Sequence, residues 1–364
     1  MADLSARDSA IKFGAGRYRQ ERNLLPELGE EIARFGKRVL IIAGTRSWAA
    51  VEPKLAPSMK EAGIDWDLVI WKGACSAQAA NELAERAHEF NADEVIGIGG
   101  GKNMDLAKAT GELAGMGVIN IPTSISQCAP FACTSVMYTP EGAKDVTWRY
   151  AHEIDACYLD LDIVAKCPVR YAAAGILDAM AKKIEILNGR PSLDVTDTDI
   201  DLFTAYKFAE YTSDVLDRRA QEAIEAIRAG EANKALSDVA FINVPVTGII
   251  SNTTRGYNQT QLAHVFYDCT RTLFTREVAD VVHGEIVAVG LFLQLHFNGL
   301  EHQEDELRKL LADWEMPRNL SDLGIEPTEE NLDAIEEYIV NSRHYNSTDP
   351  ADRARLHESI RQMI

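Results

Sequence analysis

The chain has little positive charge and few cysteines, and these shortages exclude several classes of protein. Its 37 basic residues stand against 56 acidic ones, and the net charge of −19 would repel both a nucleic-acid backbone and an anionic membrane surface. The six cysteines include no C-x-x-C pair and no disulfide framework, which indicates reduced thiols. No apolar run approaches the ~20 residues that span a bilayer, and the N-terminus has no targeting pattern. We therefore expect a cytoplasmic protein that binds neither nucleic acid nor membrane.

The pattern of hydrophobic residues predicts two domains of different class. Up to about residue 164, short β-branched runs alternate with amphipathic stretches, which is typical of a parallel α/β layer. The expected strands are 38–44, 66–71, 94–100, 117–123 and 156–161, and the expected crossover helices are 26–36, 79–90 and 103–115. From Pro168 onward, long helical periodicities follow one another without convincing strands. We therefore predict an α/β domain over 1–164 and an all-helical domain over 165–364.

Residues 95–109, VIGIGGGKNMDLAKA, join an apolar strand to a helix through three consecutive glycines. A folded chain keeps such glycines where a Cβ atom would be in the way, at positive φ or under a ligand. A helix beginning near Asn103 would direct free N–H groups and its positive dipole end into the gap, which suits a phosphate or pyrophosphate. Asp105, in the expected first turn, equally suits the dipole alone. The pattern is not G-x-G-x-x-G and does not follow the first strand, so a turn without ligand also explains it.

Three residues of the second half are candidates for one metal site. Asp178, His264 and His283 offer one carboxylate and two imidazoles, a donor set that suits catalytic Zn²⁺ with one open position. Spacing alone does not establish that they converge, and each residue taken singly is also explained as a core or surface group. His283 is the strongest local candidate because Gly284 and an apolar helix follow it. His296, farther along that helix, is interpreted as a core or surface histidine.

These motifs together resemble the iron-containing alcohol dehydrogenase superfamily and, within it, the zinc-dependent glycerol dehydrogenase branch. The matching segments follow in family order: GAGRYRQERNLLPEL, GIGGGKNMDLAKA, IPTSISQCAPFACTSVMYTPEG, AAAGILDAMAKKIE, AHVFYDC and HGEIVAVG. The resemblance implies an N-terminal dinucleotide-binding domain, a C-terminal helical domain, an active site between them and a homo-oligomer. It also implies that Asp178, His264 and His283 are the metal ligands. Lys182 stands where iron-binding members have a further histidine, so we expect Zn²⁺ rather than Fe²⁺.

The resemblance also implies which residues bind the cofactor. It places Gly100, Gly101, Lys102 and Asp105 at the phosphates, and Thr123, Ser126, Thr134 and Tyr138 along the rest of the dinucleotide. NAD-preferring members have an acid after the strand 38–44, where this chain has Gly44, Thr45, Arg46 and Ser47. With no acid to reject a 2′-phosphate, and with Arg46 and hydroxyls to bind it, we favour NADP over NAD. The structural alternatives are a solvated Arg46, turn-capping hydroxyls and a packed Tyr138.

A departure from the family pattern concerns the substrate. In glycerol dehydrogenases an aspartate that holds the polyol precedes the AP of the loop, whereas this chain has Cys128. A buried carboxylate would repel a substrate that carries a carboxylate, and a thiol would not. Cys128 therefore indicates hydroxy acids, as in the hydroxycarboxylate dehydrogenase subgroup, and it is assigned to the catalytic site with the three metal ligands. We expect no basic neighbour that would favour its thiolate, which argues against redox sensing.

The sequence thus predicts a metal-dependent, NAD(P)-linked oxidoreductase. It would transfer a hydride between nicotinamide and a small hydroxy acid or oxo acid, or a related alcohol or carbonyl. Glycerol dehydrogenase is the alternative within the same chemistry, and a dehydroquinate-synthase-like lyase or a non-catalytic member of the fold are the others. The proton relay is not identified, because core packing explains Tyr267, one turn after His264, at least as well as a catalytic role.

Overall fold

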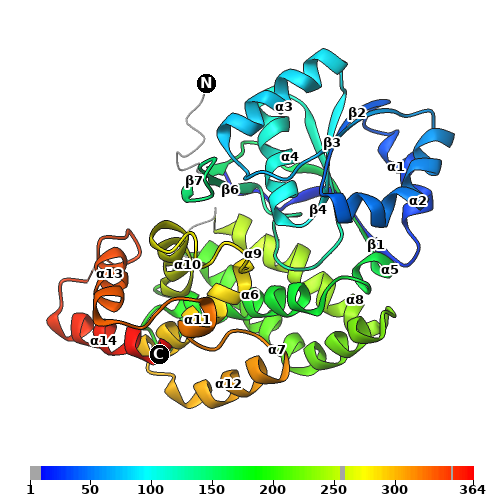
Figure 1. Cartoon of the computed structure of the whole chain (residues 1–364). Helices are drawn as coiled ribbons and strands as arrows, with labels where there is room; N and C mark the ends of the chain where they lie inside the picture. The colour runs from blue at the N-terminus through cyan, green and yellow to red at the C-terminus, as the bar shows by residue number, and fades with distance from the viewer. Residues whose placement is uncertain (1–9, 255–258, 346) are drawn as a thin grey trace.

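The computed structural model describes residues 10–254, 259–345 and 347–364, so residues 1–9 of the N-terminus considered above lie outside the described residues. An α/β layer comes first and a set of helices follows, as predicted (Figure 1). The first part contains β1 (Ala15–Glu21), η1 (Leu25–Glu27), α1 (Leu28–Ile32), β2 (Arg38–Ala43), α2 (Thr45–Glu61), β3 (Asp65–Ile70), α3 (Ala77–Phe90), β4 (Glu94–Gly99), α4 (Gly101–Ala114), β5 (Gly117–Pro122), β6 (Thr134–Tyr138), β7 (Lys144–Arg149) and β8 (Ile154–Asp160).

Six strands form one parallel sheet in the order β1-β8-β5-β4-β2-β3. The five predicted strands are confirmed as β2, β3, β4, β5 and β8. Sequence analysis missed β1 at the sheet edge and the antiparallel pair of β6 and β7, which forms a separate two-stranded sheet. The six-stranded sheet is the frame that holds the glycine-rich turn after β4.

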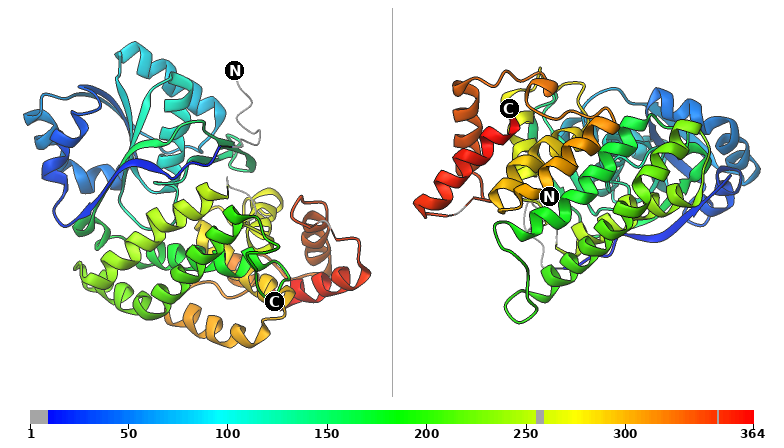
Figure 2. Two further views of the ribbon diagram at one scale, coloured as in Figure 1. Left: turned by 180° about the vertical axis from the view of Figure 1, so that it is seen from behind. Right: turned by 90° about the horizontal axis from the view of Figure 1, so that it is seen from below.

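Helices cover both faces of the sheet, and the strand sequences show why. In β2 the side chains of Val39 and Ile41 join a core cluster with α1 and α2, whereas Leu40 and Ile42 join the cluster formed with α3. Successive side chains of a strand point to opposite faces, so an unbroken apolar run fits a strand that is covered on both sides. The two helical layers are visible on either side of the sheet in Figures 1 and 2.

The remainder of the described chain is helical. Its elements are α5 (Leu161–Val164), α6 (Val169–Leu187), α7 (Ile200–Ala229), α8 (Lys234–Phe241), the π-helix η2 (Ile242–Val246), α9 (Thr247–Thr253), α10 (Leu262–Leu273), α11 (His283–Phe297), η3 (Glu301–Gln303), α12 (Glu304–Asp313), η4 (Ser321–Leu323), α13 (Glu329–Val340), α14 (Pro350–Ile360) and η5 (Arg361–Met363). The described residues after Asp160 include no strand, which confirms the predicted all-helical second part. The predicted boundary between residues 164 and 165 falls between α5 and α6.

The structure differs from the predicted elements at two places in the cofactor region. Helix α4 begins at Gly101 rather than near Asn103, so Asp105 lies in its second turn. Residues 45–47, for which no element was predicted, form the first turn of α2, whose N-cap is Gly44. Each strand therefore passes almost directly into a helix, and both helix N-termini lie next to the carboxyl ends of their strands.

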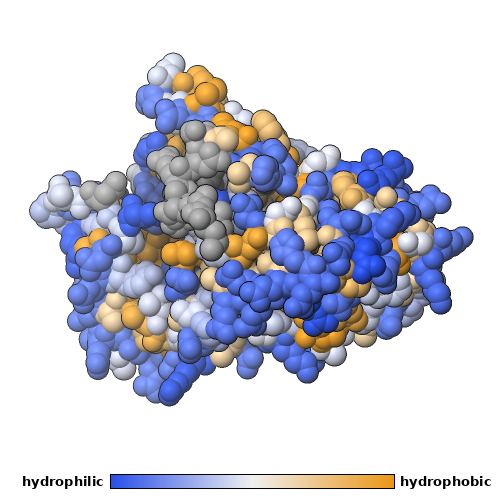
Figure 3. All heavy atoms as spheres, turned by 90° about the horizontal axis from the view of Figure 1, so that it is seen from above, coloured by the Kyte–Doolittle hydropathy of each residue, from blue (hydrophilic) through white to orange (hydrophobic). Residues whose placement is uncertain are grey.

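The surface agrees with the composition of the chain. On the face drawn in Figure 3, hydrophilic residues predominate and hydrophobic ones are scattered among them. None of the helices that the structure describes combines the length and the apolar character needed to cross a membrane.

Candidate metal centre and cofactor site

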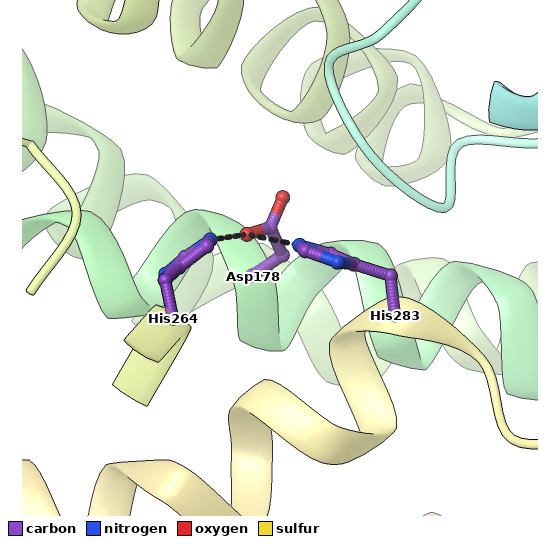
Figure 4. A group of neighbouring side chains, drawn as sticks. All are labelled: Asp178, His264 and His283. Atoms are coloured by element: carbon purple, nitrogen blue, oxygen red, sulfur yellow. Dashed lines mark ion pairs between the residues drawn. The ribbon is translucent and has the colours of Figure 1, made fainter. Parts of the chain in front are cut away.

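Three helices bring Asp178, His264 and His283 together. Asp178 lies in the middle of α6, His264 in the first turn of α10, and His283 is the first residue of α11. Both imidazoles point toward the carboxylate, with Nε2 of His264 3.2 Å and Nε2 of His283 3.6 Å from Oδ1 of Asp178 (Figure 4). The potential ligand atoms all lie within 4.8 Å of one another, so one carboxylate and two imidazoles can converge on a divalent cation.

Close packing of α6 against α11 fixes the position of His283. A Cβ atom on Gly284 would lie 2.0 Å from the carbonyl oxygen of Ala174, so the two helices approach each other at a glycine. Burial foremost, and the neighbouring His264, lower the pKa of His283 although Asp178 raises it. The imidazole is therefore neutral at neutral pH, which is the form that binds a metal.

Glu185, which sequence analysis did not assign, orients His264. The carboxylate is fully buried, and its Oε2 lies 2.6 Å from Nδ1 of His264. Its Oε1 accepts the backbone N–H groups of Gln261 and His264 at 2.8 and 2.9 Å. Burial lowers the pKa of His264, but Glu185 and Asp178 outweigh it and raise the pKa. Because Nδ1–H is given to Glu185, the ring would offer Nε2 to a metal once Nε2 loses its proton. Glu185 thus sets the tautomer of a metal ligand and satisfies free donors at the N-terminus of α10.

Lys182 lies among the same groups. Its ammonium donates to Oδ1 of Asp178 at 3.0 Å and lies 3.1 Å from Nε2 of His264. Burial lowers the pKa of Lys182 and raises that of Asp178, but the attraction between the two charges outweighs it in both cases. The pKa of Lys182 is raised and that of Asp178 is well below its usual range, so the pair is ionised.

The sheet topology places the cofactor region at a switch point. Strands β2 and β4 are neighbours in the sheet. The connection after β2 leads to β3 on one side of this pair, and the connection after β4 leads to β5 on the other side. Ligands of open α/β sheets bind at the carboxyl ends of such strands. Here the two turns touch, since Ser47 Oγ donates to the carbonyl of Ile98 at 3.2 Å and Asn103 Nδ2 donates to it at 2.9 Å. The predicted cofactor groups Gly44 to Arg46 and Gly100 to Lys102 therefore lie at one site, with Thr45, Arg46 and Lys102 exposed.

The three consecutive glycines at the end of β4 and the start of α4 have different structural reasons. Gly99 has φ of +139°, a conformation that L side chains rarely adopt, and a Cβ atom on Gly101 would lie 1.4 Å from Nε2 of Gln127. Gly100 has ordinary φ of −97°, and a Cβ atom there would have Oγ of Ser124 at 4.0 Å as its nearest neighbour. The protein itself therefore does not require glycine at position 100. The space beside Gly100 leaves room for a ligand at the N-terminus of α4.

Asp105 has a structural role in this arrangement. Its buried carboxylate pairs with Lys108 at 2.9 Å and accepts the backbone N–H of Val136 at 3.1 Å. Burial raises the pKa of Asp105 in spite of Lys108. Lys108 also donates to the carbonyl oxygens of Ala129 and Ala132 at 2.8 and 2.9 Å, and so fixes the loop that contains Cys128. Asp105, which was predicted to line the phosphates, is thus paired with the lysine that holds the loop of Cys128.

The other predicted cofactor residues lie on the segment that follows β5. Thr123 donates its backbone N–H to the carbonyl of Gly99 at 2.9 Å, which connects this segment to the glycine turn. Ser126, three residues later, is buried. Thr134 is the first residue of β6, and Tyr138 is the last. The Tyr138 hydroxyl forms a hydrogen bond with that of Tyr267, whose ring packs edge-on against His283 with centroids 4.2 Å apart. Tyr138 therefore links the predicted cofactor segment to the metal centre.

Cys128 lies within the electrostatic influence of the metal centre. The charges of Asp178, Lys182 and Lys108 all act on its thiol, so the expectation of no basic neighbour is wrong. Burial outweighs the two lysines and, together with Asp178, raises the pKa of the thiol to about 11. The cysteine is therefore a neutral thiol at physiological pH, and the argument against a reactive thiolate holds for a different reason.

Comparison with known proteins identifies the α/β part. Residues 15–157 match the model of the iron-containing alcohol dehydrogenase family. A glycolaldehyde reductase of Halobacterium salinarum is 26% identical to this chain, and the alignment covers 92% of this chain and 91% of the reductase. A glycerol dehydrogenase of Pseudomonas putida is 29% identical, and the alignment covers 87% of this chain and 86% of the dehydrogenase. The similarity to these two enzymes therefore continues through the helical part of the chain.

The chain has a glycerol dehydrogenase-like fold. The crystal structure of a probable glycerol dehydrogenase from Sinorhizobium meliloti 1021 superposes with a TM-score of 0.82 over 97% of this chain and 98% of its own, at 24% identity. Glycerol dehydrogenase from Schizosaccharomyces pombe gives 0.81 over 98% and 91%, at 21% identity. The predicted combination of an α/β domain and a helical domain is confirmed.

Proposed function

We propose that the chain is a metal-dependent, NAD(P)-linked oxidoreductase that interconverts a small hydroxy acid and the corresponding oxo acid. The observation that carries the substrate class is Cys128, a neutral thiol beside Asp178 and Lys182. The family resemblance places an acid at this position in glycerol dehydrogenases, where it holds the polyol. Without that acid the site no longer repels a substrate carboxylate.

Asp178, His264 and His283 are the proposed metal ligands. We propose Zn²⁺ rather than Fe²⁺ because Lys182 stands where the iron-binding proteins that the chain resembles have a further histidine. When bound, the metal supplies Lewis-acid polarisation of a substrate oxygen, and the nicotinamide cofactor supplies or accepts the hydride. The protein supplies geometry: Glu185 keeps the tautomer of His264, and Lys108 holds the loop of Cys128. The hydrogen-bonded hydroxyls of Tyr138 and Tyr267 next to His283 are our candidates for holding the proton.

The turns after β2 and β4 are the proposed cofactor site. Gly100 and Gly101 would take the pyrophosphate at the N-terminus of α4, with Lys102 exposed beside them. Exposed Thr45 and Arg46 at the N-terminus of α2 suit a 2′-phosphate, so NADP is preferred to NAD. A homo-oligomer and a cytoplasmic location complete the proposal, both carried over from the sequence.

A second candidate substrate class is a small neutral polyol or carbonyl. It is favoured by the relatives named glycolaldehyde reductase and glycerol dehydrogenase, which match more than four-fifths of this chain. The two classes differ in charge, so the residue at position 128 distinguishes them.

The experiment is the substitution Cys128→Asp in the zinc-loaded protein, with Cys128→Ser as the uncharged control. We expect Cys128→Asp to lower kcat/KM for a small 2-oxo acid by at least about 30-fold, as a buried like charge would, and Cys128→Ser to retain most of it. Dihydroxyacetone and glycolaldehyde serve as neutral substrates in the same assay. Equal losses on charged and neutral substrates would contradict the proposed substrate class.

A further inference from the structure

The ammonium of Lys182 lies in the centre of the proposed site without a role in the mechanism given above. Lys182 follows Asp178 by four residues and precedes Glu185 by three, so the three side chains share one face of α6. Lys182 is 3% exposed, and its Nζ contacts Oδ1 of Asp178 and Nε2 of His264. A lysine is almost never buried to this extent without acceptors for its charge.

A metal in this site would compete for both of those acceptors. A carboxylate oxygen of Asp178 and Nε2 of His264 would be two of its three ligand atoms, so a bound cation would take the single lone pair of Nε2 and weaken the bond from the ammonium to the carboxylate. The ammonium would then be a buried cation beside a second cation, which is an unfavourable arrangement. A buried charge of this kind requires a new anionic partner.

The charges of the surroundings indicate the same need. Two carboxylates, Asp178 and Glu185, stand against the ammonium of Lys182 and the two charges of a divalent cation, with neutral imidazoles. The site therefore holds one excess positive charge when metal is bound. The nearby Asp105 and Lys108 form a pair of opposite charges and do not change this balance.

We propose that Lys182 selects the substrate by charge: in the metal-loaded protein its ammonium binds the carboxylate of the oxo acid or hydroxy acid, next to the thiol of Cys128. This inference rests on the proposed function and deepens it. Cys128 removes a negative charge from the substrate site, and Lys182 adds a positive one. Because Lys182 would touch the unreacting carboxylate rather than the carbonyl, it determines specificity more than turnover.

The test compares Lys182→Met, which keeps the length of the side chain and removes its charge, with Lys182→Arg and with the neighbouring Lys183→Met. Lys183 lies on the same helix and is partly exposed, outside the cluster described here. Pyruvate is the charged substrate, and glycolaldehyde is a neutral carbonyl of similar size. We expect Lys182→Met to raise KM for pyruvate at least about 30-fold, the loss of a buried charge-assisted bond, and to change KM for glycolaldehyde less than about threefold. Lys183→Met should resemble the wild type, and Lys182→Arg should recover part of the loss.

A binding measurement separates this inference from the proposed function. Oxamate, an unreactive analogue of pyruvate, is titrated calorimetrically into the zinc-loaded protein, with zinc content measured for each variant. The inference predicts that Lys182→Met retains zinc and binds oxamate at least about 30-fold more weakly than the wild type does. Unchanged oxamate affinity would overturn the inference, as would an equal loss of turnover on both substrates. A wild type that binds oxamate through Lys182 but does not turn over oxo acids would instead overturn the proposed function.

Discussion

At the scale of single residues, the glycines in β4 and in the turn after it differ in whether the fold has room for a side chain. Gly97, inside β4, packs so closely that a Cβ atom would lie 2.7 Å from Oδ1 of Asn120 and 2.9 Å from Cβ of Ala107. Gly100 has no such neighbour, since the nearest atom would be 4.0 Å away. Substitutions at these two positions therefore separate the requirements of the fold from those of a ligand.

We predict that Gly100→Ala leaves the thermal midpoint of unfolding within about 2 °C of the wild type and weakens NADPH binding at least tenfold. The added methyl group meets only the space assigned to the pyrophosphate. Gly97→Ala is the matched control, and it should lower the midpoint by several degrees because its methyl group meets packed atoms. Thermal unfolding and fluorescence titration measure the two effects. Wild-type NADPH affinity in Gly100→Ala would disprove the placement of the cofactor.

Single residues also show what sequence could and could not reveal about the site. The resemblance named Asp178, His264 and His283, and their convergence is borne out by the geometry. Their spacing in sequence could not show it, because the three residues come from helices that meet only through tertiary packing. Glu185 had a signal that was not used, because it lies seven residues after Asp178 and therefore on the same helical face. Lys182, four residues after Asp178, was used only to distinguish zinc from iron.

At the scale of secondary-structure elements, α10 is attached to α6 through one buried carboxylate. Glu185 of α6 accepts two backbone N–H groups at the N-terminus of α10 and also holds the ring of His264. The position of a helix and the orientation of a metal ligand thus depend on the same side chain. Loss of such a hydrogen bond to a metal ligand typically weakens metal binding by roughly 10- to 100-fold.

We therefore expect Glu185→Gln to weaken zinc binding by roughly 10- to 100-fold and to destabilise the protein by about 2 kcal/mol. The amide of glutamine has one acceptor oxygen for three donors, so at least one buried N–H group loses its partner. Competition with a chromogenic chelator gives the zinc affinity, and urea unfolding of the metal-free protein gives the stability. Exposed Glu330 of α13 provides the control Glu330→Gln. Zinc affinity equal to that of the wild type would refute the role given to Glu185.

The elements that were predicted and those that were missed differ in physical character. Strands β2, β4 and β5 are buried apolar runs in the middle of a parallel sheet, which is the strongest strand signal available to a sequence. Strand β1, with the sequence AGRYRQE, is a polar edge strand that pairs only with β8, so its sequence lacks that signal. Helix α2 contains Pro53 and Pro57, residues that ordinarily argue against a helix.

At the scale of the whole molecule, a buried carboxyl group makes stability depend on pH. Glu94 opens β4 and is 4% exposed. Burial first, and then the charge of Asp155, raise its pKa from 4.5 to about 8. The folded pKa lies above the unfolded one, so this stabilising contribution is complete below about pH 4.5 and is lost as the pH rises through about 8.

We predict that Glu94→Gln makes the protein more stable than the wild type at pH 9 by roughly 1–3 kcal/mol, because the amide cannot ionise. Near pH 5 the difference should be much smaller, since the wild-type carboxyl is then protonated in the folded state. The free energy of unfolding in urea at the two pH values measures the effect. Parallel pH dependence in variant and wild type would show that Glu94 does not titrate in this range.

The general organisation of the molecule was predictable, and its detailed charge balance was not. Composition and periodicity predict an α/β layer followed by helices, because each pattern has one stable way to bury its apolar face. The neutral state of Cys128 depends instead on burial and on Asp178, which outweigh Lys182 and Lys108, and all of these contributions come from tertiary packing. The substrate class is therefore a property of the assembled site.

The most direct measurement is the ratio of kcat/KM for pyruvate to kcat/KM for dihydroxyacetone, measured with the wild-type, zinc-loaded protein and NADPH. The site proposed here, with a thiol at position 128 and an ammonium at position 182, predicts a ratio of at least about 10 in favour of the oxo acid. A ratio below one would contradict the account, because it would show that glycerol-type chemistry persists without the acid at position 128.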